Sequence, residues 1–162
     1  MFAIFTPPVA PGLARLLAGA MSGVGLGGAL VAGARLAPPP TAFEDNLLTH
    51  DARRYARNVA QVEQHPDLAL GSPTWGWLAF AFAATGELQH GDGPPHVSTP
   101  VTVCAAGADR IVDTGVVRQV TARFPHGRYL EIPGAYHEIL QETDEIRARF
   151  WAAFDEATAA IR

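Results

Sequence analysis

Strand and helix signals alternate at short intervals in the last third of the chain, and this alternation limits the possible folds. Residues 101–107, VTVCAAG, form a continuous apolar run typical of a strand buried on both faces, and 128–132, RYLEI, form a second short strand. Apolar residues at helical spacing follow each strand: Val112, Val116, Val117, Val120 and Phe124, then Ile146, Phe150, Phe154, Ala157 and Ile161. Strand, helix, strand, helix is a βαβα unit, so we predict an α/β fold with a parallel sheet.

The preceding residues have a different pattern. MFAIF, within residues 1–6, is a run of five apolar residues bounded by Thr6-Pro7-Pro8 and is expected to be the last part of a buried strand. Residues 7–97 are mostly helical, apolar and rich in Pro and Gly. We expect helices after Pro11, after a cap at Asp51, and after Gly71-Ser72-Pro73. The last of these, TWGWLAFAFAA, is apolar on all sides and should be buried on most of them.

Composition excludes several classes of protein. With 48% hydrophobic and 17% charged residues the chain is globular, and its net charge of -4 with scattered arginines argues against nucleic acid as a partner. The single cysteine, Cys104, excludes an intrachain disulfide and favours a reducing, cytoplasmic compartment. Five histidines lack metal-ligand spacing and are expected at the surface: His50, His65, His90, His96 and His126. We expect neither a metal nor a cofactor.

The uncharged run between Arg15 and Arg35 is about long enough to cross a bilayer. Six of its nineteen residues are glycine, and no basic segment precedes it as in a signal peptide, so an apolar, partly helical surface element is favoured. Within it GVGLGG, residues 23–28, matches a dinucleotide-binding pattern, but a helix-like run precedes it where a strand is required.

Two polar residues follow the predicted strands. Asp109 comes after the first strand and His137 after the second, in IPGAYHEIL. The carboxyl ends of parallel strands lie at one edge of a sheet, so an Asp109–His137 hydrogen bond is geometrically easy. Such an aspartate orients the imidazole and stabilises its protonated form. Asp113 competes for this role but is placed to cap the next helix.

The two motifs together resemble the last strands of the serine α/β-hydrolases, in the branch of bacterial lysophospholipases and monoacylglycerol lipases. VTVCAAGADRIVD resembles the turn with that family's catalytic aspartate, and RYLEIPGAYHEIL the turn with its histidine. FEDNLLTHDARRYARN and GSPTWGWL are similar to the segment that joins the family's helical cap to its core. The resemblance implies a core strand at 1–6, a cap or lid with its connection at 7–97, and the C-terminal part of the hydrolase core at 98–162.

The resemblance implies a carboxylic-ester hydrolase in which Asp109 and His137 are catalytic, acting on a monoacyl lipid or ester. The family's nucleophile is a serine in a G-x-S-x-G elbow, and no such motif occurs here: Ser22 lies in GAMSGV, Ser72 in LGSPT and Ser98 in HVSTP. Cys104 is no substitute, because it lies inside a strand. We therefore expect a fragment that requires an upstream serine and is inactive alone.

Several alternatives stay open. The chain could be a non-catalytic, truncated hydrolase that binds lipid or a partner, or part of a hydrolase with an aspartate nucleophile. The apolar cap segment could contact the inner face of a bacterial membrane or only cover an acyl pocket. The aromatic residues Trp75, Trp77, Phe80 and Phe82 could line that pocket, although a role in the core is favoured. An exposed sheet edge predicts self-association.

Overall fold

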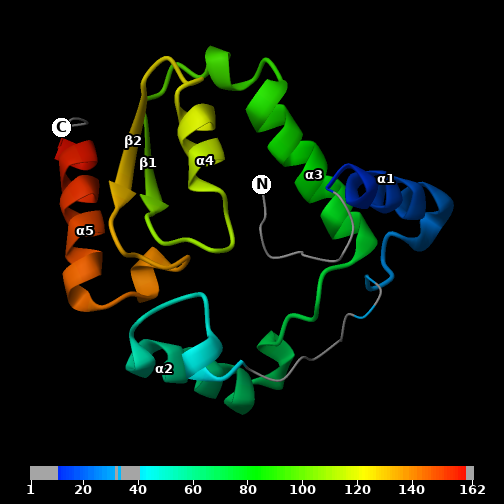
Figure 1. Ribbon diagram of the computed structural model, residues 1–162, viewed down its shortest axis with the longest axis horizontal. Helices are drawn as coiled ribbons and strands as arrows, with labels where there is room; N and C mark the ends of the chain where they lie inside the picture. Colours follow the sequence, from blue (N-terminus) through cyan, green and yellow to red (C-terminus); the bar gives the residue numbers. More distant parts are fainter. Residues whose placement is uncertain (1–10, 32, 34–40, 160–162) are drawn as a thin grey trace. The chain divides into compact units, whose positions relative to one another are not determined.

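The computed structural model describes residues 11–31, 33 and 41–159 (Figure 1). The helices are α1 (Pro11–Met21), α2 (Ala52–Gln64), α3 (Trp75–His90), α4 (Thr114–Thr121) and α5 (Asp144–Ala159). The strands are β1 (Val101–Ala106) and β2 (Gly127–Ile132). The strand expected at 1–6 lies outside the described residues.

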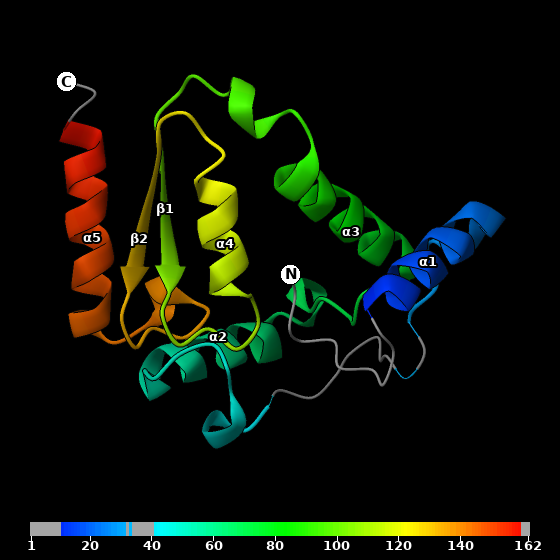
Figure 2. The same ribbon diagram turned by 45° about the horizontal axis from the view of Figure 1, so that its top comes forward.

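The predicted βαβα unit is present. β1 and β2 pair in parallel, with Val101 opposite Gly127 and Ala106 opposite Ile132. α4 and α5 pack against both strands (Figure 2). Ile132 is only 1% exposed and forms the centre of a small core. The other members of this core are Ala106 and Ala135, with Cys104, Leu130, Ile139 and Ile146 packed against them.

Side-chain caps fix where two helices begin. Oδ1 of Asp113 accepts a hydrogen bond from Val116 N at 3.1 Å, so α4 starts at Thr114 and Asp113 has the capping role predicted for it. Oδ1 of Asp51 likewise accepts from Arg53 N and Arg54 N at 3.0 and 3.1 Å. The structure therefore confirms the predicted start of α2.

The chain divides into two compact units. Among the described residues, one unit comprises 41–59 and 92–159, and the other comprises 11–31 and 60–91. Residues 41–59 thus belong with the sheet, whereas 60–91 do not. Long-range hydrogen bonds explain the difference, because Thr49 and His50 bind the backbone or side chain of Gln141 and Glu142.

The other unit consists mainly of α1 and α3, which contact each other. Gly76 N donates to Gly27 O at 2.8 Å, and Trp75 N to Ala29 O at 3.0 Å. α3 is capped by Thr74, whose Oγ1 accepts from Trp77 N, so the helix expected after Gly71-Ser72-Pro73 begins at Trp75. GVGLGG follows α1, a helix, and not the strand that a dinucleotide-binding loop requires.

The expected burial of α3 is also wrong. Phe80 is 71% exposed and Trp77 49%, while Leu78 and Ala81 are its buried residues. A helix that is apolar around its whole circumference cannot bury every face against one neighbouring helix. Among the described residues, no helix combines the length and apolar character needed to span a membrane.

Candidate active site

The loops after β1 and β2 are tied to each other at the carboxyl edge of the sheet. Gly107 N donates to Ile132 O and Ala108 N to Ala135 O, both at 2.9 Å. A Cβ at position 107 would lie 2.9 Å from Ile132 O, closer than Cβ atoms approach in proteins, so glycine is required there. Gly134, with φ of 75°, turns the second loop in a conformation that favours glycine.

This arrangement brings Asp109 and His137 together. Nδ1 of His137 lies 2.9 Å from Oδ2 of Asp109. The other carboxylate oxygen accepts from Ile111 N at 2.7 Å and Val112 N at 3.0 Å. The Asp109 side chain is only 7% exposed, whereas that of His137 is 31% exposed. The aspartate is thus held rigidly, and the imidazole is accessible.

The pKa of Asp109 reflects opposing effects. Burial raises it, but the hydrogen bonds from His137, Val112 N and Ile111 N lower it more, so the pKa lies below the ordinary 3.8. The carboxylate is therefore ionised at neutral pH and accepts the proton of Nδ1. This leaves Nε2 of His137 as the acceptor nitrogen, and within residues 41–159 no further side chain is bonded to the ring. Such a pair can take a proton from a hydroxyl.

A second carboxylate–histidine pair lies beside the first. Glu142 is completely buried, and its Oε1 lies 2.8 Å from Nδ1 of His50. Tyr136, the residue before His137, stacks on the His50 ring with centroids 3.8 Å apart. Sequence reasoning placed His50 at the surface; the ring is partly exposed, but this pairing was missed.

Residues 46–51 support the histidine loop from outside the sheet. His137 N donates to Leu47 O at 3.4 Å and Glu138 N to Leu48 O at 2.9 Å. Oδ1 of Asn46 accepts from Leu48 N and Thr49 N, both at 2.9 Å, which fixes the turn that presents these carbonyls. The sequence feature that could have indicated this contact was the resemblance of FEDNLLTHDARRYARN to a segment that joins cap and core.

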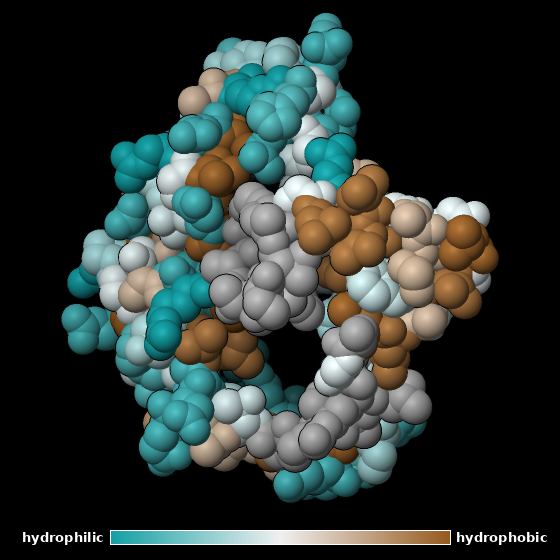
Figure 3. All heavy atoms as spheres, turned by 45° about the vertical axis from the view of Figure 1, so that its right-hand side comes forward, coloured by the Kyte–Doolittle hydropathy of each residue, from teal (hydrophilic) through white to brown (hydrophobic). Residues whose placement is uncertain are grey.

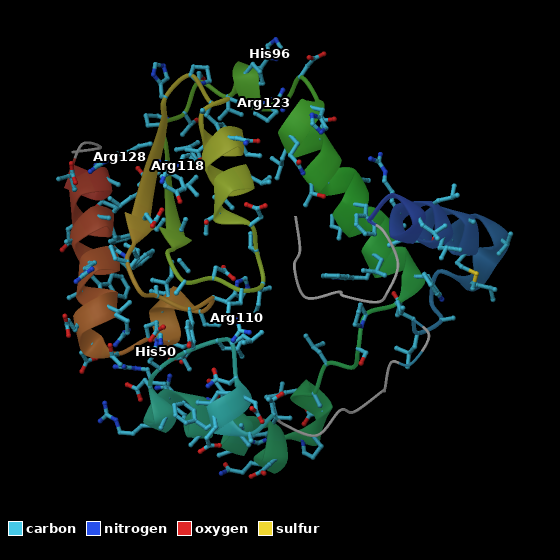
Figure 4. All side chains as sticks on the ribbon, viewed as in Figure 1. His50, His96, Arg110, Arg118, Arg123 and Arg128 are labelled. Carbon is cyan, nitrogen blue, oxygen red and sulfur yellow. The ribbon has the colours of Figure 1, made fainter. Side chains whose placement is uncertain are left out.

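A pocket of about 570 Å³ opens beside the pair. Its walls include Arg110 and Tyr136, which are the chain neighbours of Asp109 and His137. The remaining lining residues are Phe43, Glu44, Asp45, Asn46, Leu47, Thr49 and His50. Two of its lining residues, Arg110 and His50, are labelled in Figure 4. The pocket is therefore polar on several sides; Asp109 and His137 do not line it, but the residue next to each of them does.

Other candidate groups lie elsewhere. Ser98 precedes β1, at the strand end opposite to the loop with Asp109. Cys104 lies within β1, and burial raises the pKa of its thiol, which disfavours the nucleophilic thiolate. Across 11–31, 33 and 41–159, no three His, Cys, Asp or Glu side chains are grouped so that they could hold a metal ion.

Aspartate and histidine after successive parallel strands are arranged as in the C-terminal part of serine α/β-hydrolases. Comparison with known families agrees: the family described as "Serine aminopeptidase, S33" matches residues 3–144. The chain belongs to this family.

Individual relatives place the chain further within the α/β-hydrolases. It is 34% identical over 113 residues to lysophospholipase L2 of Escherichia coli K12, covering 65% of this chain and 33% of that protein. It is 32% identical over 84 residues to a probable lysophospholipase L2 of Haemophilus influenzae, covering 52% of this chain and 26% of that protein. The chain thus spans about a third or less of these curated relatives.

A solved structure shares the fold. A soluble variant of monoglyceride lipase from Saccharomyces cerevisiae, in complex with a substrate analogue, aligns with a TM-score of 0.64 and 14% identity. The match covers 88% of this chain and 47% of that one. The predicted resemblance to the lysophospholipase and monoacylglycerol lipase branch of the α/β-hydrolases is therefore confirmed.

Proposed function

We propose that this chain supplies the acid and the base of a serine-type carboxylic-ester hydrolase whose nucleophile lies outside these 162 residues. The observation that carries the proposal is the 2.9 Å contact between His137 Nδ1 and an Asp109 carboxylate anchored by two backbone N–H groups. His137 is the general base, and Asp109 orients it and stabilises the imidazolium that forms.

The reaction would have two stages. Nε2 of His137 takes the proton of the serine hydroxyl as the oxygen attacks the ester carbonyl, and then donates that proton to the departing alkoxide. In the second stage the same nitrogen takes a proton from water as the water oxygen attacks the acyl-enzyme, and then returns that proton to the departing serine oxygen, which releases the fatty acid. Asp109 keeps its negative charge in both stages, in agreement with its lowered pKa.

The substrate we propose is a monoacyl lipid, either a lysophospholipid or a monoacylglycerol. The names of the relatives support this class. So does the unit of α1 and α3, where apolar side chains gather on one face (Figure 3): Leu16, Val24 and Phe80 are 67%, 72% and 71% exposed. We assign this unit, within the cap segment 7–97, to the acyl chain or to a lipid surface. The pocket beside Arg110 has room for the polar part of the ester.

The test is hydrolysis of both lipids by this chain together with a segment that carries G-x-S-x-G, in one polypeptide or added separately. Asp109→Asn and His137→Ala should each abolish most of the activity. Asp113→Asn is the matched control, because Asp113 caps α4 and should leave the rate nearly unchanged. Unchanged hydrolysis after His137→Ala would refute the assignment.

The second candidate function is lipid binding without catalysis by a self-associated form of the chain, and it is favoured by the absence of G-x-S-x-G from the sequence. Among the described strands β1 and β2 form a two-stranded sheet, so each leaves one edge unpaired for another copy. Assay of this chain alone with a p-nitrophenyl ester, and with His137→Ala as control, separates the two functions. Activity that depends on His137 would reveal an unrecognised nucleophile within the chain.

A further inference from the structure

Glu142 is a buried carboxylate that the proposed chemistry does not use. Its side chain is 0% exposed, and an ionised carboxylate in such a place is costly unless its oxygens are fully bonded. Oε1 accepts from Tyr136 N at 2.7 Å and lies 2.8 Å from His50 Nδ1. Oε2 accepts from His50 N at 3.0 Å and Thr143 N at 3.2 Å. All four of these contacts of the Glu142 carboxylate are therefore made with Tyr136, His50 and Thr143.

The charged form of Glu142 is the favoured one. Burial raises its pKa, but the hydrogen bonds from Tyr136 N, His50 N and the His50 ring lower it more, so the pKa lies below the ordinary 4.5. Two of these donors are backbone N–H groups, which cannot turn away. In glutamine at this position an amide N–H₂ group would replace one carboxylate oxygen. This group is itself a donor and could not accept the hydrogen bonds from these backbone N–H groups.

These bonds surround the backbone of His137. Tyr136 N, one residue before it, is bonded to Glu142. His137 N and Glu138 N are bonded to the carbonyls of Leu47 and Leu48, in the segment that Glu142 holds through His50 N. The ring contact between Tyr136 and His50 is a further link between the same two segments. Asp109 determines the rotation of the imidazole, but it has no bond to this backbone.

We propose that Glu142, together with His50, is a positioning residue that fixes the backbone of the histidine loop so that Nε2 of His137 meets the reacting hydroxyl. This rests on the catalytic role proposed for His137, since a displacement of about 1 Å can reduce a rate by about 100-fold. In this proposal Glu142 acts on His137 without touching its ring. The buried carboxylate holds residues 46–51 and 136–138 in a fixed arrangement.

The experiment is nuclear magnetic resonance on this chain, which needs no catalysis. It follows amide exchange at His137 and Glu138, and the Nδ1 proton of His137 that is bonded to Asp109. In Glu142→Gln we expect both amides to exchange at least 10-fold faster and the Nδ1 proton signal to be lost, while exchange in β1 and β2 changes less than twofold. The matched control is Glu138→Gln, because Glu138 is exposed in the same loop, and it should change none of these signals.

A second variant covers the case in which Glu142→Gln also loses the protection of β1 and β2. His50→Phe keeps a ring against Tyr136 and the backbone N–H bond to Glu142 but loses the bond from the imidazole, and it should speed exchange at the same two amides at least threefold with the sheet intact. Unchanged loop signals in Glu142→Gln, or in His50→Phe where Glu142→Gln unfolds, would overturn the proposal, as would equal losses in Glu138→Gln. Failure of the proposed function is separate: it would appear as hydrolysis that survives His137→Ala.

Discussion

Replacing Thr49 by valine tests how the chain joins residues 46–51 to the histidine loop. Thr49 is only 2% exposed, and its hydroxyl makes two bonds: Oγ1 donates to Gln141 O at 2.7 Å and accepts from Asp51 N at 2.9 Å. Valine has nearly the same shape and offers neither bond. A buried polar group left unpaired costs about 1–3 kcal/mol, and water can partly reach the half-buried Gln141. We expect Thr49→Val to lower the free energy of unfolding by about 2–4 kcal/mol.

The matched variant is Thr49→Ser, which keeps the hydroxyl and loses one methyl group worth about 0.8 kcal/mol. Urea unfolding, monitored through amide exchange in β1 and β2, gives the free energy of unfolding of each variant for the unit that contains the sheet. In a domain of about 60–100 residues each kcal/mol corresponds to about 4–8 °C in Tm, so the two variants should be well resolved. If the serine variant were as destabilised as the valine variant, the two hydrogen bonds would not be what holds this segment.

Three further predictions concern the site and its surroundings. Asp109 and Glu142 both have a pKa in the folded chain that is lower than the ordinary 3.8 and 4.5. The stability that these two carboxylates contribute is therefore present above their ordinary pKa values and is lost as the pH falls through their lower folded pKa values. Acid unfolding monitored by circular dichroism should shift to higher pH in Asp109→Asn. Gly107→Ala should destabilise the unit by about 1–3 kcal/mol, because the new Cβ would crowd Ile132 O, and thermal unfolding should show no such loss for alanine at the exposed Gly12, where nothing lies within 4 Å. Cys104, with its raised thiol pKa, should react with iodoacetamide more slowly than a free thiol at pH 8, and equal rates would contradict its burial in β1.

Local patterns were enough to predict the sheet and the neighbourhood of Asp109 and His137. The first strand is a continuous apolar run and the second a short strand signal, and each is followed by a helix with regular apolar spacing, so parallel pairing was the simplest arrangement. Once the strands are neighbours, the residues that follow them must lie at the same edge. The hydrogen bond follows from this geometry, while the catalytic role of the two residues stays a prediction.

The contacts of Glu142 could not be predicted in the same way. His50 and Glu142 are separated by 92 positions, and neither stands in a periodic pattern that indicates its partner. From the sequence alone, a glutamate next to a helix start is expected to be exposed to solvent, because its burial depends on the tertiary fold. The cap of α3 shows a local limit of the same kind, since Ser72 and Thr74 are both suitable cap residues and the structure uses Thr74.

Among the described residues, the unit that contains β1 and β2 is built from two stretches of chain, 41–59 and 92–159, with 60–91 inserted between them. During synthesis, residues 46–51 emerge long before Glu142 and Gln141 exist to bind them, so this unit can complete its folding only late. The cost of closing such a loop rises slowly, by about 0.6 kcal/mol for each doubling of its length. Thermodynamically, the inserted stretch could therefore be lengthened or exchanged in related proteins with little penalty to the unit that holds Asp109 and His137.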